Sequence, residues 1–304
     1  MNPRVVWHMM PGDKERLVRK AVEFRPDAVI PCLEDGVAYE PAAKQSAREL
    51  LATLSTDVDW AGEEILFYPR INRSNSEYWR DDVATLLEGK PDGLVIAKEE
   101  SPDRVRDVDE FLTEQERRTG RPEGSVPLIV MVETALGLRR TYELASASPR
   151  VEGLLLGRED LSASLGIMRR HSEMVSSGHE ELLYARSKFV ADCKAAGKEA
   201  IDGASFTYSD DGYMSHDSSL AARLGFTGKL SAHPKHVKSI RVGFLPDPAD
   251  VEIARQMVEL TEEYARNGDA PVFGVAGMEV TPPIVDQARL VLARAAWAER
   301  EVSE

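Results

Sequence analysis

Apolar residues recur between positions 5 and 243 in short β-branched runs that are separated by longer amphipathic stretches. Runs of this kind predict buried strands, and apolar residues spaced three or four apart predict helices. Their alternation is typical of a parallel sheet built from βαβ units. We expect eight strands, each followed by a helical stretch, at positions 5–9, 28–33, 65–71, 93–97, 127–132, 151–156, 199–201 and 229–231.

Eight such repeats predict an α/β protein with a closed TIM (β/α)8 barrel. An open doubly wound sheet is the alternative, but no GxGxxG motif follows the first strand, as a dinucleotide-binding sheet would require. After the sixth strand we expect a long irregular stretch before the next helix begins near residue 180.

The pattern changes after residue 243. Pro246 and Pro248 break it, and Asp247 followed by Pro248 is typical of a helix N-terminus. We expect one helix to about residue 266, a turn-rich loop and a glycine-rich piece, and a last helix from 284 to about 299. The sequence therefore predicts a barrel domain at 1–243 and a C-terminal helical extension at 244–304, which would serve as a lid or an oligomer arm.

Composition narrows the class of protein. The 304 residues are 42% hydrophobic and 30% charged, which is ordinary for a globular chain. The net charge is −14, and we find no basic stripe of the kind that nucleic-acid binding needs. No apolar run reaches the ~20 residues of a membrane span, and the N-terminus lacks a signal-peptide pattern. Cys32 and Cys193 form no CxxC pair, so we expect two reduced, buried thiols in a cytoplasmic protein.

Charged and polar residues stand at the ends of the predicted strands, where barrel enzymes place their active sites. Glu133 and Asp160 follow neighbouring strands and offer the oxygen ligands that Mg²⁺ prefers, and without a cation they would repel each other. Arg70 would bind a substrate carboxylate through paired hydrogen bonds. The residues at or just past the strand ends are Glu34, Asp35, Arg70, Asn72, Lys98, Glu99, Glu100, Glu133, Thr134, Gly157, Arg158, Glu159, Asp160, Asp202 and His233.

Each candidate also has a purely structural interpretation. A charged residue at a strand end is often a solvated loop residue, and the run of three charges at 98–100 favours that interpretation. Asp202 would cap a turn before a glycine, and His233 would fix a turn before a proline. His8 lies in a strand pattern and is typical of a hydrogen-bonded core histidine. The array as a whole is harder to explain in this way than any one member.

Several short motifs follow one another in a fixed order. They are PGD with KA at 11–13 and 20–21, AVIPCLEDGV at 28–37, PRIN at 69–72, DGLVIAK at 92–98, VETALG at 132–137, GREDL with LG at 157–161 and 165–166, and LGFTGK with HP at 224–229 and 233–234. In these segments the chain resembles the citrate lyase beta-subunit family of the HpcH/HpaI aldolase superfamily, which includes malyl-CoA and citramalyl-CoA lyases. The resemblance runs from about residue 4 to residue 242.

The resemblance implies a TIM barrel that binds Mg²⁺, with Mn²⁺ as a second acceptable metal, and that assembles into homotrimers or homohexamers. It implies Glu133 and Asp160 as metal ligands and Arg70 as the group that holds the substrate's carboxylate. Glu34 and Asp35 would lie beside the metal and hold its waters. Besides Arg70 and the two metal ligands, the substrate contacts that the resemblance implies are Pro11, Gly12, Lys98 and Gly157.

One motif departs from the family. Acyl-CoA lyases of the family carry a late GxMIDxP motif, whose Asp reaches a neighbouring subunit's site as an acid/base group. Here the corresponding piece reads GMEVTPP, with Thr281 at the Asp position. A threonine does not take up a proton near neutral pH as a carboxylate does. Either Glu279 or another group takes over this role, or the reaction differs.

The expected function is a Mg²⁺-dependent carbon–carbon lyase that cleaves or forms a 3-hydroxyacyl-CoA such as malyl-CoA or citramalyl-CoA through a metal-stabilised enolate. Thr281 motivates an alternative, an aldolase that acts on free hydroxy-oxo acids without CoA and releases pyruvate or glyoxylate. A third alternative is a non-catalytic subunit of a lyase complex. Both enzyme alternatives require a small carboxylic acid or its CoA thioester as substrate.

Overall fold

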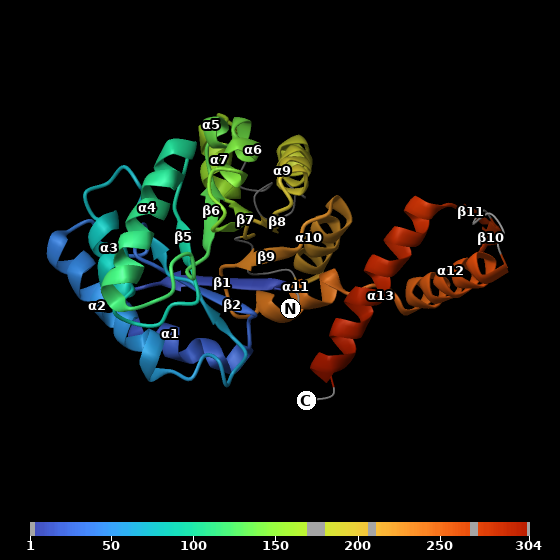
Figure 1. Cartoon of the computed structure of the whole chain (residues 1–304), viewed down its shortest axis with the longest axis horizontal. Coiled ribbons are helices and arrows are strands. Elements are labelled where there is room, and N and C mark those ends of the chain that lie inside the picture. Colours follow the sequence, from blue (N-terminus) through green and yellow to red (C-terminus); the bar gives the residue numbers. More distant parts are fainter. Residues whose placement is uncertain (1–3, 169–179, 206–210, 268–272, 303–304) are drawn as a thin grey trace. The chain divides into compact units, whose positions relative to one another are not determined.

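The computed structural model describes residues 4–168, 180–205, 211–267 and 273–302. The chain divides into two compact units (Figure 1). The larger unit is Arg4–Gly243, and the smaller one begins at Phe244. Among the described residues, no helix has both the length and the apolar character that crossing a membrane requires.

Parallel strands form a closed barrel in the larger unit (Figure 1). Among the described residues they are β1 (Val6–Pro11), β2 (Ala28–Cys32), β3 (Leu66–Phe67), β4 (Arg70–Ile71), β5 (Leu94–Ile96), β6 (Leu128–Val132), β7 (Val151–Leu156), β8 (Glu199–Asp202) and β9 (Gly228–Ser231). The first strand pairs with both β2 and β9, which closes the barrel. Both β3 and β4 pair with β2, and together they form one stave that Pro69 interrupts because proline has no N–H. The barrel therefore has eight staves, and the predicted TIM fold is confirmed.

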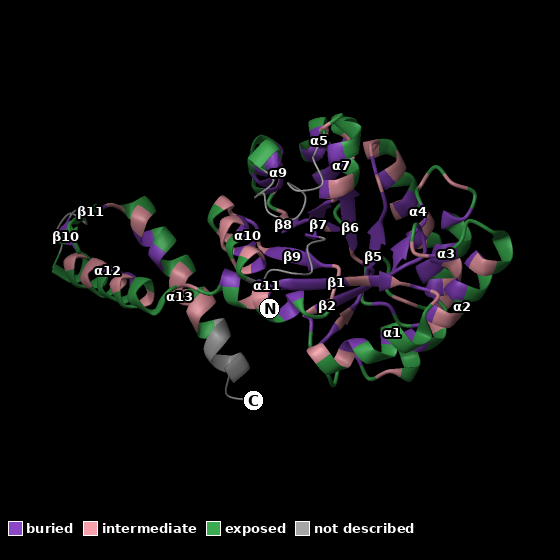
Figure 2. Cartoon of the chain, turned by 180° about the vertical axis from the view of Figure 1, so that it is seen from behind, coloured by how far each residue is buried: buried purple, intermediate pink, exposed green. Residues whose placement is uncertain are grey.

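The barrel interior is a single apolar cluster. The five residues of β6 are all buried, as parallel strands covered on both faces require. Alternate residues of this strand, Ile129 and Met131, belong to the interior cluster. Every stave contributes to it, and its members are Trp7, Ala28, Ile30, Tyr68, Val95, Ile129, Met131, Leu155, Ile201, Ala204 and Leu230. Figure 2 shows the buried strands in purple. This packed interior is a core and leaves the chemistry to the rim.

Helices follow the strands along the chain. They are α1 (Glu15–Lys20), η1 (Ala21–Phe24), α2 (Pro41–Asp57), α3 (Trp79–Leu86), α4 (Pro102–Thr119), α5 (Ala135–Arg139), α6 (Thr141–Ala145), α7 (Arg158–Ser164), η2 (Glu180–Leu182), α9 (Leu183–Ala195), α10 (Asp211–Leu224) and α11 (His236–Phe244). Helix α4 shows how local sequence signals set the two ends and the buried face of a helix. Pro102 occupies its first turn, and Gly120 ends it in the left-handed conformation with φ 74°. Its buried positions, among them Val105, Val108 and Leu112, recur at helical spacing.

One part of the barrel differs from the expectation. We expected an irregular stretch after the sixth strand, but the seven-residue helix α7 begins directly after Gly157. This helix is short and begins with three charged residues, so its apolar periodicity is too weak to predict it. Residues 169–179 of the same stretch lie outside the described residues.

The smaller unit has a core of its own. Helices α12 (Pro248–Asn267) and α13 (Pro282–Val302) pack with an antiparallel hairpin of β10 (Phe273–Val275) and β11 (Met278–Val280). The sequence predicted both helices but only a glycine-rich piece in place of the hairpin. Ala276 and Gly277 form its two-residue turn, and both have positive φ, 50° and 80°, as a type I′ turn requires.

Candidate functional site

The strand ends of β2, β4, β5, β6 and β7 bring charged side chains together at one mouth of the barrel. These strands are consecutive neighbours in the sheet, so residues at their C-terminal ends meet at the same rim. The residues that contact one another there are Glu34, Asp35, Arg70, Arg73, Lys98, Glu133 and Asp160.

Arg70 begins β4 directly opposite Cys32 of β2 and is buried. Its Nε and Nη2 donate hydrogen bonds to the Cys32 sulfur at 3.2 and 3.0 Å. Nη2 also lies 2.9 Å from Glu34 Oε2, and Nη1 lies 3.7 Å from Glu133 Oε2. Burial works to lower the pKa of Arg70, but the Cys32 sulfur and the two carboxylates outweigh it and raise that pKa. The guanidinium is therefore held in one plane and stays charged.

Lys98 connects the carboxylates of the site. Its backbone lies in the left-handed region with φ 48°, which is uncommon for a residue other than glycine. The Lys98 backbone N–H donates to Glu133 Oε2 at 3.0 Å. The side-chain Nζ lies 2.6 Å from Asp35 Oδ2, 3.3 Å from Glu34 Oε1 and 3.3 Å from Asp160 Oδ1. One residue thus contacts the four acidic groups that the sequence placed near a metal.

Glu133 follows β6 and is buried, with 3% of its surface exposed. Burial raises the pKa of Glu133 to about 7. Arg70 and Lys98 act in the opposite direction, and the negative charges of Asp160 and Glu34 add to the rise. An ionised Glu133 therefore needs further positive charge nearby.

Gly157 makes room for the Glu133 carboxylate. A side chain at position 157 would place its Cβ 2.3 Å from Glu133 Cγ and 2.5 Å from Oε1. Atoms cannot approach this closely, so only glycine fits at this point of the rim. Gly157 therefore contributes space to the site.

Asp160 is the third residue of α7, and its side chain is 50% exposed. Its Oδ1 faces Lys98, and within the described part of the chain no donor contacts Oδ2. The same holds for Glu133 Oε1, because only Oε2 of that residue accepts a hydrogen bond. Each of the two carboxylates thus keeps one oxygen that is open to a cation.

These two open oxygens fit Mg²⁺, which proteins usually bind through one or two carboxylates, with water and substrate oxygens completing the shell. Across the described ranges, no group of three or more His, Cys, Asp or Glu side chains is arranged to hold a metal. A cation at Glu133 and Asp160 would therefore depend on water and substrate for its remaining positions.

Two charged residues that follow β4 and β5 differ from what the sequence indicates. Arg73 donates to Glu34 Oε1 at 3.0 Å and directly follows the PRIN motif, but nothing in the motif marks it. Glu99 is only 1% exposed, so the prediction of a solvated charge run at 98–100 is wrong. The Glu99 carboxylate accepts the backbone N–H groups of Glu100 and Ser101, both at 2.9 Å, which supplies the partners that a buried charge needs.

Other predicted residues have different surroundings. Pro11 ends β1, and the Gly12 N–H donates to the Cys32 carbonyl at 2.9 Å. Both residues therefore lie beside the end of β2, where Cys32 pairs with Arg70. Asn72 donates to the Asp82 carboxylate from its backbone and side chain, at 2.9 and 2.7 Å, and makes no contact with the site carboxylates.

Two of the structural interpretations are now settled. His8 is buried, and its Nδ1 lies 3.1 Å from Ser231 Oγ; burial lowers the pKa of His8 to about 4, as expected for a neutral core histidine. Asp202 does not simply cap a turn, because its carboxylate is completely buried and lies 2.6 Å from Lys229 Nζ. Cys32 and Cys193 are both free and buried, as predicted.

Glu279 lies in β11 of the smaller unit, where its side chain is exposed. Its role as the acid/base group remains a prediction.

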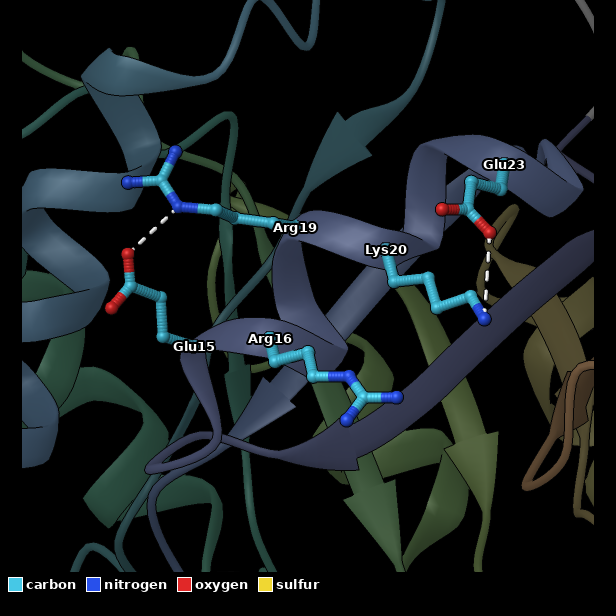
Figure 3. A pocket seen from close by; sticks show the side chains of 5 residues that line it. All are labelled: Glu15, Arg16, Arg19, Lys20 and Glu23. Atoms are coloured by element: carbon cyan, nitrogen blue, oxygen red, sulfur yellow. Dashed lines mark hydrogen bonds and ion pairs between the residues drawn. The ribbon is translucent and has the colours of Figure 1, made fainter.

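A surface hollow of about 560 Å³ lies on α1 and η1 and contains none of the residues of the mouth (Figure 3). The exposed side chains that line it are Glu15, Arg16, Arg19, Lys20 and Glu23. Arg19 pairs with Glu15 at 2.8 Å and Lys20 with Glu23 at 3.6 Å. Arg16 has no ion-pair partner among the residues that the structure describes.

Comparison with known proteins places the chain in a family. A family model described as HpcH/HpaI aldolase/citrate lyase matches residues 5–234. The citrate lyase subunit beta of Haemophilus influenzae is 32% identical over 293 residues, which cover 96% of this chain and 97% of the relative. The (3S)-malyl-CoA thioesterase of Cereibacter sphaeroides is 31% identical, covering 96% of this chain and 93% of the relative.

A solved structure agrees with these relatives. Protein CitE from Mycobacterium tuberculosis, in complex with magnesium, acetoacetate and coenzyme A, matches with a TM-score of 0.77 at 26% identity, and the match covers 96% of this chain and 98% of that one. The region that the family model matches, residues 5–234, includes all eight staves and the five strand ends of the mouth. The chain therefore belongs to the HpcH/HpaI aldolase/citrate lyase family of carbon–carbon lyases.

Proposed function

We propose that this protein is a lyase that uses Mg²⁺, or Mn²⁺, to cleave or form a 3-hydroxyacyl-CoA such as malyl-CoA or citramalyl-CoA. The observation that carries the proposal is the pairing of Glu133 and Asp160, each with one open oxygen, around the single residue Lys98. The relative that binds magnesium, acetoacetate and coenzyme A supports the same ligand classes.

Glu133 and Asp160 would hold the metal, with Glu34 and Asp35 beside it. When bound, the metal supplies Lewis-acid stabilisation of the negative charge that develops on the substrate's oxygen. The buried Glu133 and the half-exposed Asp160 place that charge at the boundary between the core and the open mouth. The substrate therefore approaches from the open side of the mouth.

Arg70 would bind the carboxylate of the substrate. Its Nε and Nη2 are occupied by Cys32 and Glu34, but Nη1 has only weak partners, the Met131 sulfur at 3.6 Å and Glu133 Oε2 at 3.7 Å. Nη1 is thus the nitrogen that is available to a substrate oxygen. Because it also lies beside Glu133, a carboxylate bound there is next to the proposed metal ligands.

A CoA thioester also brings phosphate groups, which need cations outside the mouth. The hollow of Figure 3 has three cationic side chains, Arg16, Arg19 and Lys20. Of these, Arg16 has no ion-pair partner in the described part of the chain. Helix α1 begins at Glu15, close in the chain to Pro11 and Gly12 at the mouth. We therefore assign the phosphates to this hollow, since guanidinium groups bind phosphate oxygens well.

The direct test incubates the purified protein with malyl-CoA or citramalyl-CoA and Mg²⁺ and separates the products. Carbon–carbon cleavage of malyl-CoA gives acetyl-CoA and glyoxylate, whereas thioester hydrolysis gives malate and free CoA. We expect acetyl-CoA that depends on the metal. Free CoA alone would indicate a thioesterase, and no product from either thioester would contradict the proposal.

Thr281 favours a second candidate, an aldolase on free hydroxy-oxo acids, because the tail lacks the carboxylate that acyl-CoA lyases of the family use. Release of pyruvate or glyoxylate from CoA-free acids would support it.

For the lyase, Glu279 is the proposed acid/base group. It would act in a homotrimer or homohexamer in which the C-terminal unit is a lid or an arm. Light scattering of the intact chain measures that assembly.

A further inference from the structure

A second group of charges joins α7 to the neighbouring helices and strands. The five-charge cluster consists of Arg158 of α7, Arg186 of α9, Asp202 of β8, Asp217 of α10 and Lys229 of β9, and each side chain is at most 1% exposed. These five segments are far apart in the sequence, so the cluster joins them only in the folded barrel.

Every member of the cluster has a partner of opposite charge. Asp217 accepts from Arg158 at 2.7 Å and contacts Arg186 at 3.1 Å and Lys229 at 2.9 Å. Asp202 accepts from Arg186 at 2.8 Å and Lys229 at 2.6 Å. The three cations lower the pKa of Asp217 far below its usual range although burial acts the other way. Asp217 is therefore ionised within the cluster.

The cluster contains three cations and two carboxylates. Removing either arginine would leave two cations for two carboxylates, a balanced set. Charge balance therefore does not require the third cation, although placing any charge in the interior is costly. The two arginines differ in where they lie in the fold, because Arg158 begins α7 and Arg186 belongs to α9.

In the sequence, Arg158 lies close to residues that shape both halves of the proposed metal site. It directly follows Gly157, which leaves space for Glu133, and it precedes Asp160 by two residues in a helix of only seven. A helix this short has little stability of its own. The Gly157 N–H donates to the Val132 carbonyl at 2.9 Å, so this point of the chain is held from the strand side as well.

The path of the Arg158 side chain is also fixed. A Cβ on Gly203 would lie 2.6 Å from Arg158 Cγ, so the absence of a side chain at position 203 lets the guanidinium reach Asp217. The Arg158 carbonyl accepts the Ser162 hydroxyl at 2.7 Å, which ties the next turn of α7 to the same residue. Asp160, by contrast, has Lys98 as its only ion-pair partner in the described ranges.

We propose that Arg158 is a positioning residue that anchors the first turn of α7 in the five-charge cluster and so holds Asp160 beside Glu133 for one divalent cation. This inference rests on the proposed metal site. Arg186 contacts the same two aspartates from α9, and none of its described partners belongs to the mouth. It is therefore the matched control, with the same chemistry and burial but without the connection to Asp160.

The experiment compares the intact wild-type chain with Arg158→Met and Arg186→Met. Calorimetric titration with Mg²⁺ alone measures the dissociation constant, and thermal unfolding without metal measures stability. We expect similar melting temperatures for the two variants, because each leaves a balanced cluster. We expect about 10–100-fold weaker Mg²⁺ binding for Arg158→Met, the usual effect of losing support behind a metal ligand, and a change below about twofold for Arg186→Met.

Equal Mg²⁺ affinities for the two variants, whether both are normal or both are weakened, would overturn the proposal for Arg158 and leave the metal site itself standing. A wild-type chain that does not bind Mg²⁺ would instead overturn the metal site and this inference with it. If Arg158→Met does not fold, Arg158→Lys and Arg186→Lys provide the same comparison, since lysine keeps the charge and loses the planar group.

Discussion

The barrel contains two groups of charged side chains, and they differ in how far they are exposed to solvent. In the five-charge cluster all members are buried, and each carboxylate has at least two cationic partners. At the mouth, Asp35 and Asp160 are 57% and 50% exposed, and Glu133 and Asp160 each keep an oxygen that no described donor contacts. Charges that are buried on all sides hold segments together, whereas a half-exposed carboxylate such as Asp160 can bind a ligand that arrives from solvent.

The largest expected effect separates the two groups by stability. Asp202→Asn leaves three buried cations around one remaining carboxylate, so we expect a loss of about 3–5 kcal/mol in the free energy of unfolding. Denaturant unfolding of the metal-free protein measures this loss. The matched variant at the mouth is Asp160→Asn, which we expect to unfold at nearly the wild-type denaturant concentration. Equal destabilisation of the two variants would remove the distinction between the two groups.

The next effect concerns Mg²⁺ affinity. Asp160→Asn replaces a charged ligand by a neutral one, so we expect binding about 100-fold weaker, or roughly 2.7 kcal/mol. Calorimetric titration measures the change. Glu159→Gln is the control, because it removes the same charge from the adjacent position of α7 and is expected to stay within about twofold of the parent. An unchanged affinity in Asp160→Asn would exclude Asp160 as a ligand.

These predictions follow from features that the sequence indicates to different extents. The alternation of strands and helices predicts the barrel, and the barrel rim brings Glu34, Arg70 and Glu133 together because parallel strands end at one edge. The role of Lys98 as the hub depends on its left-handed backbone, which no local pattern reveals.

The five-charge cluster could not be predicted from the sequence for a different reason. It depends on packing between segments up to 71 positions apart, from Arg158 to Lys229. Asp202 on its own looks like a turn cap, and only the neighbouring helices show that it is an ion-pair partner. The β10–β11 hairpin escaped prediction because each strand has only three residues.

A third prediction addresses substrate binding at the mouth. Arg70→Lys removes the planar group that Cys32 and Glu34 orient, so we expect KM for the substrate acid or thioester to rise about tenfold, or roughly 1.4 kcal/mol. Steady-state kinetics with saturating Mg²⁺ measure it. Arg73→Lys is the control, because Arg73 contacts the same Glu34 but is 49% exposed. A parental KM for Arg70→Lys would mean that another group binds the carboxylate.

The smallest effect is the dependence of metal binding on pH. Burial raises the pKa of Glu133 to about 7, so a proton competes with the metal below that pH. In the metal-free protein the raised pKa favours the folded state at low pH, and this contribution disappears as the pH rises through about 7. Mg²⁺ should therefore bind more weakly, and raise the melting temperature less, at pH 6 than at pH 8. Glu133→Gln should remove this dependence, and a dependence that persists in Glu133→Gln would assign the titration to another group.

We expect the mouth to bind one divalent cation through Glu133 and Asp160 next to Arg70. A crystal structure of the protein with Mg²⁺ and pyruvate tests it most directly. We expect one ion between Glu133 Oε1 and an Asp160 oxygen, with the pyruvate carboxylate in contact with Arg70 Nη1. Electron density that shows the two carboxylates turned apart, or the ion bound at other side chains, would contradict it.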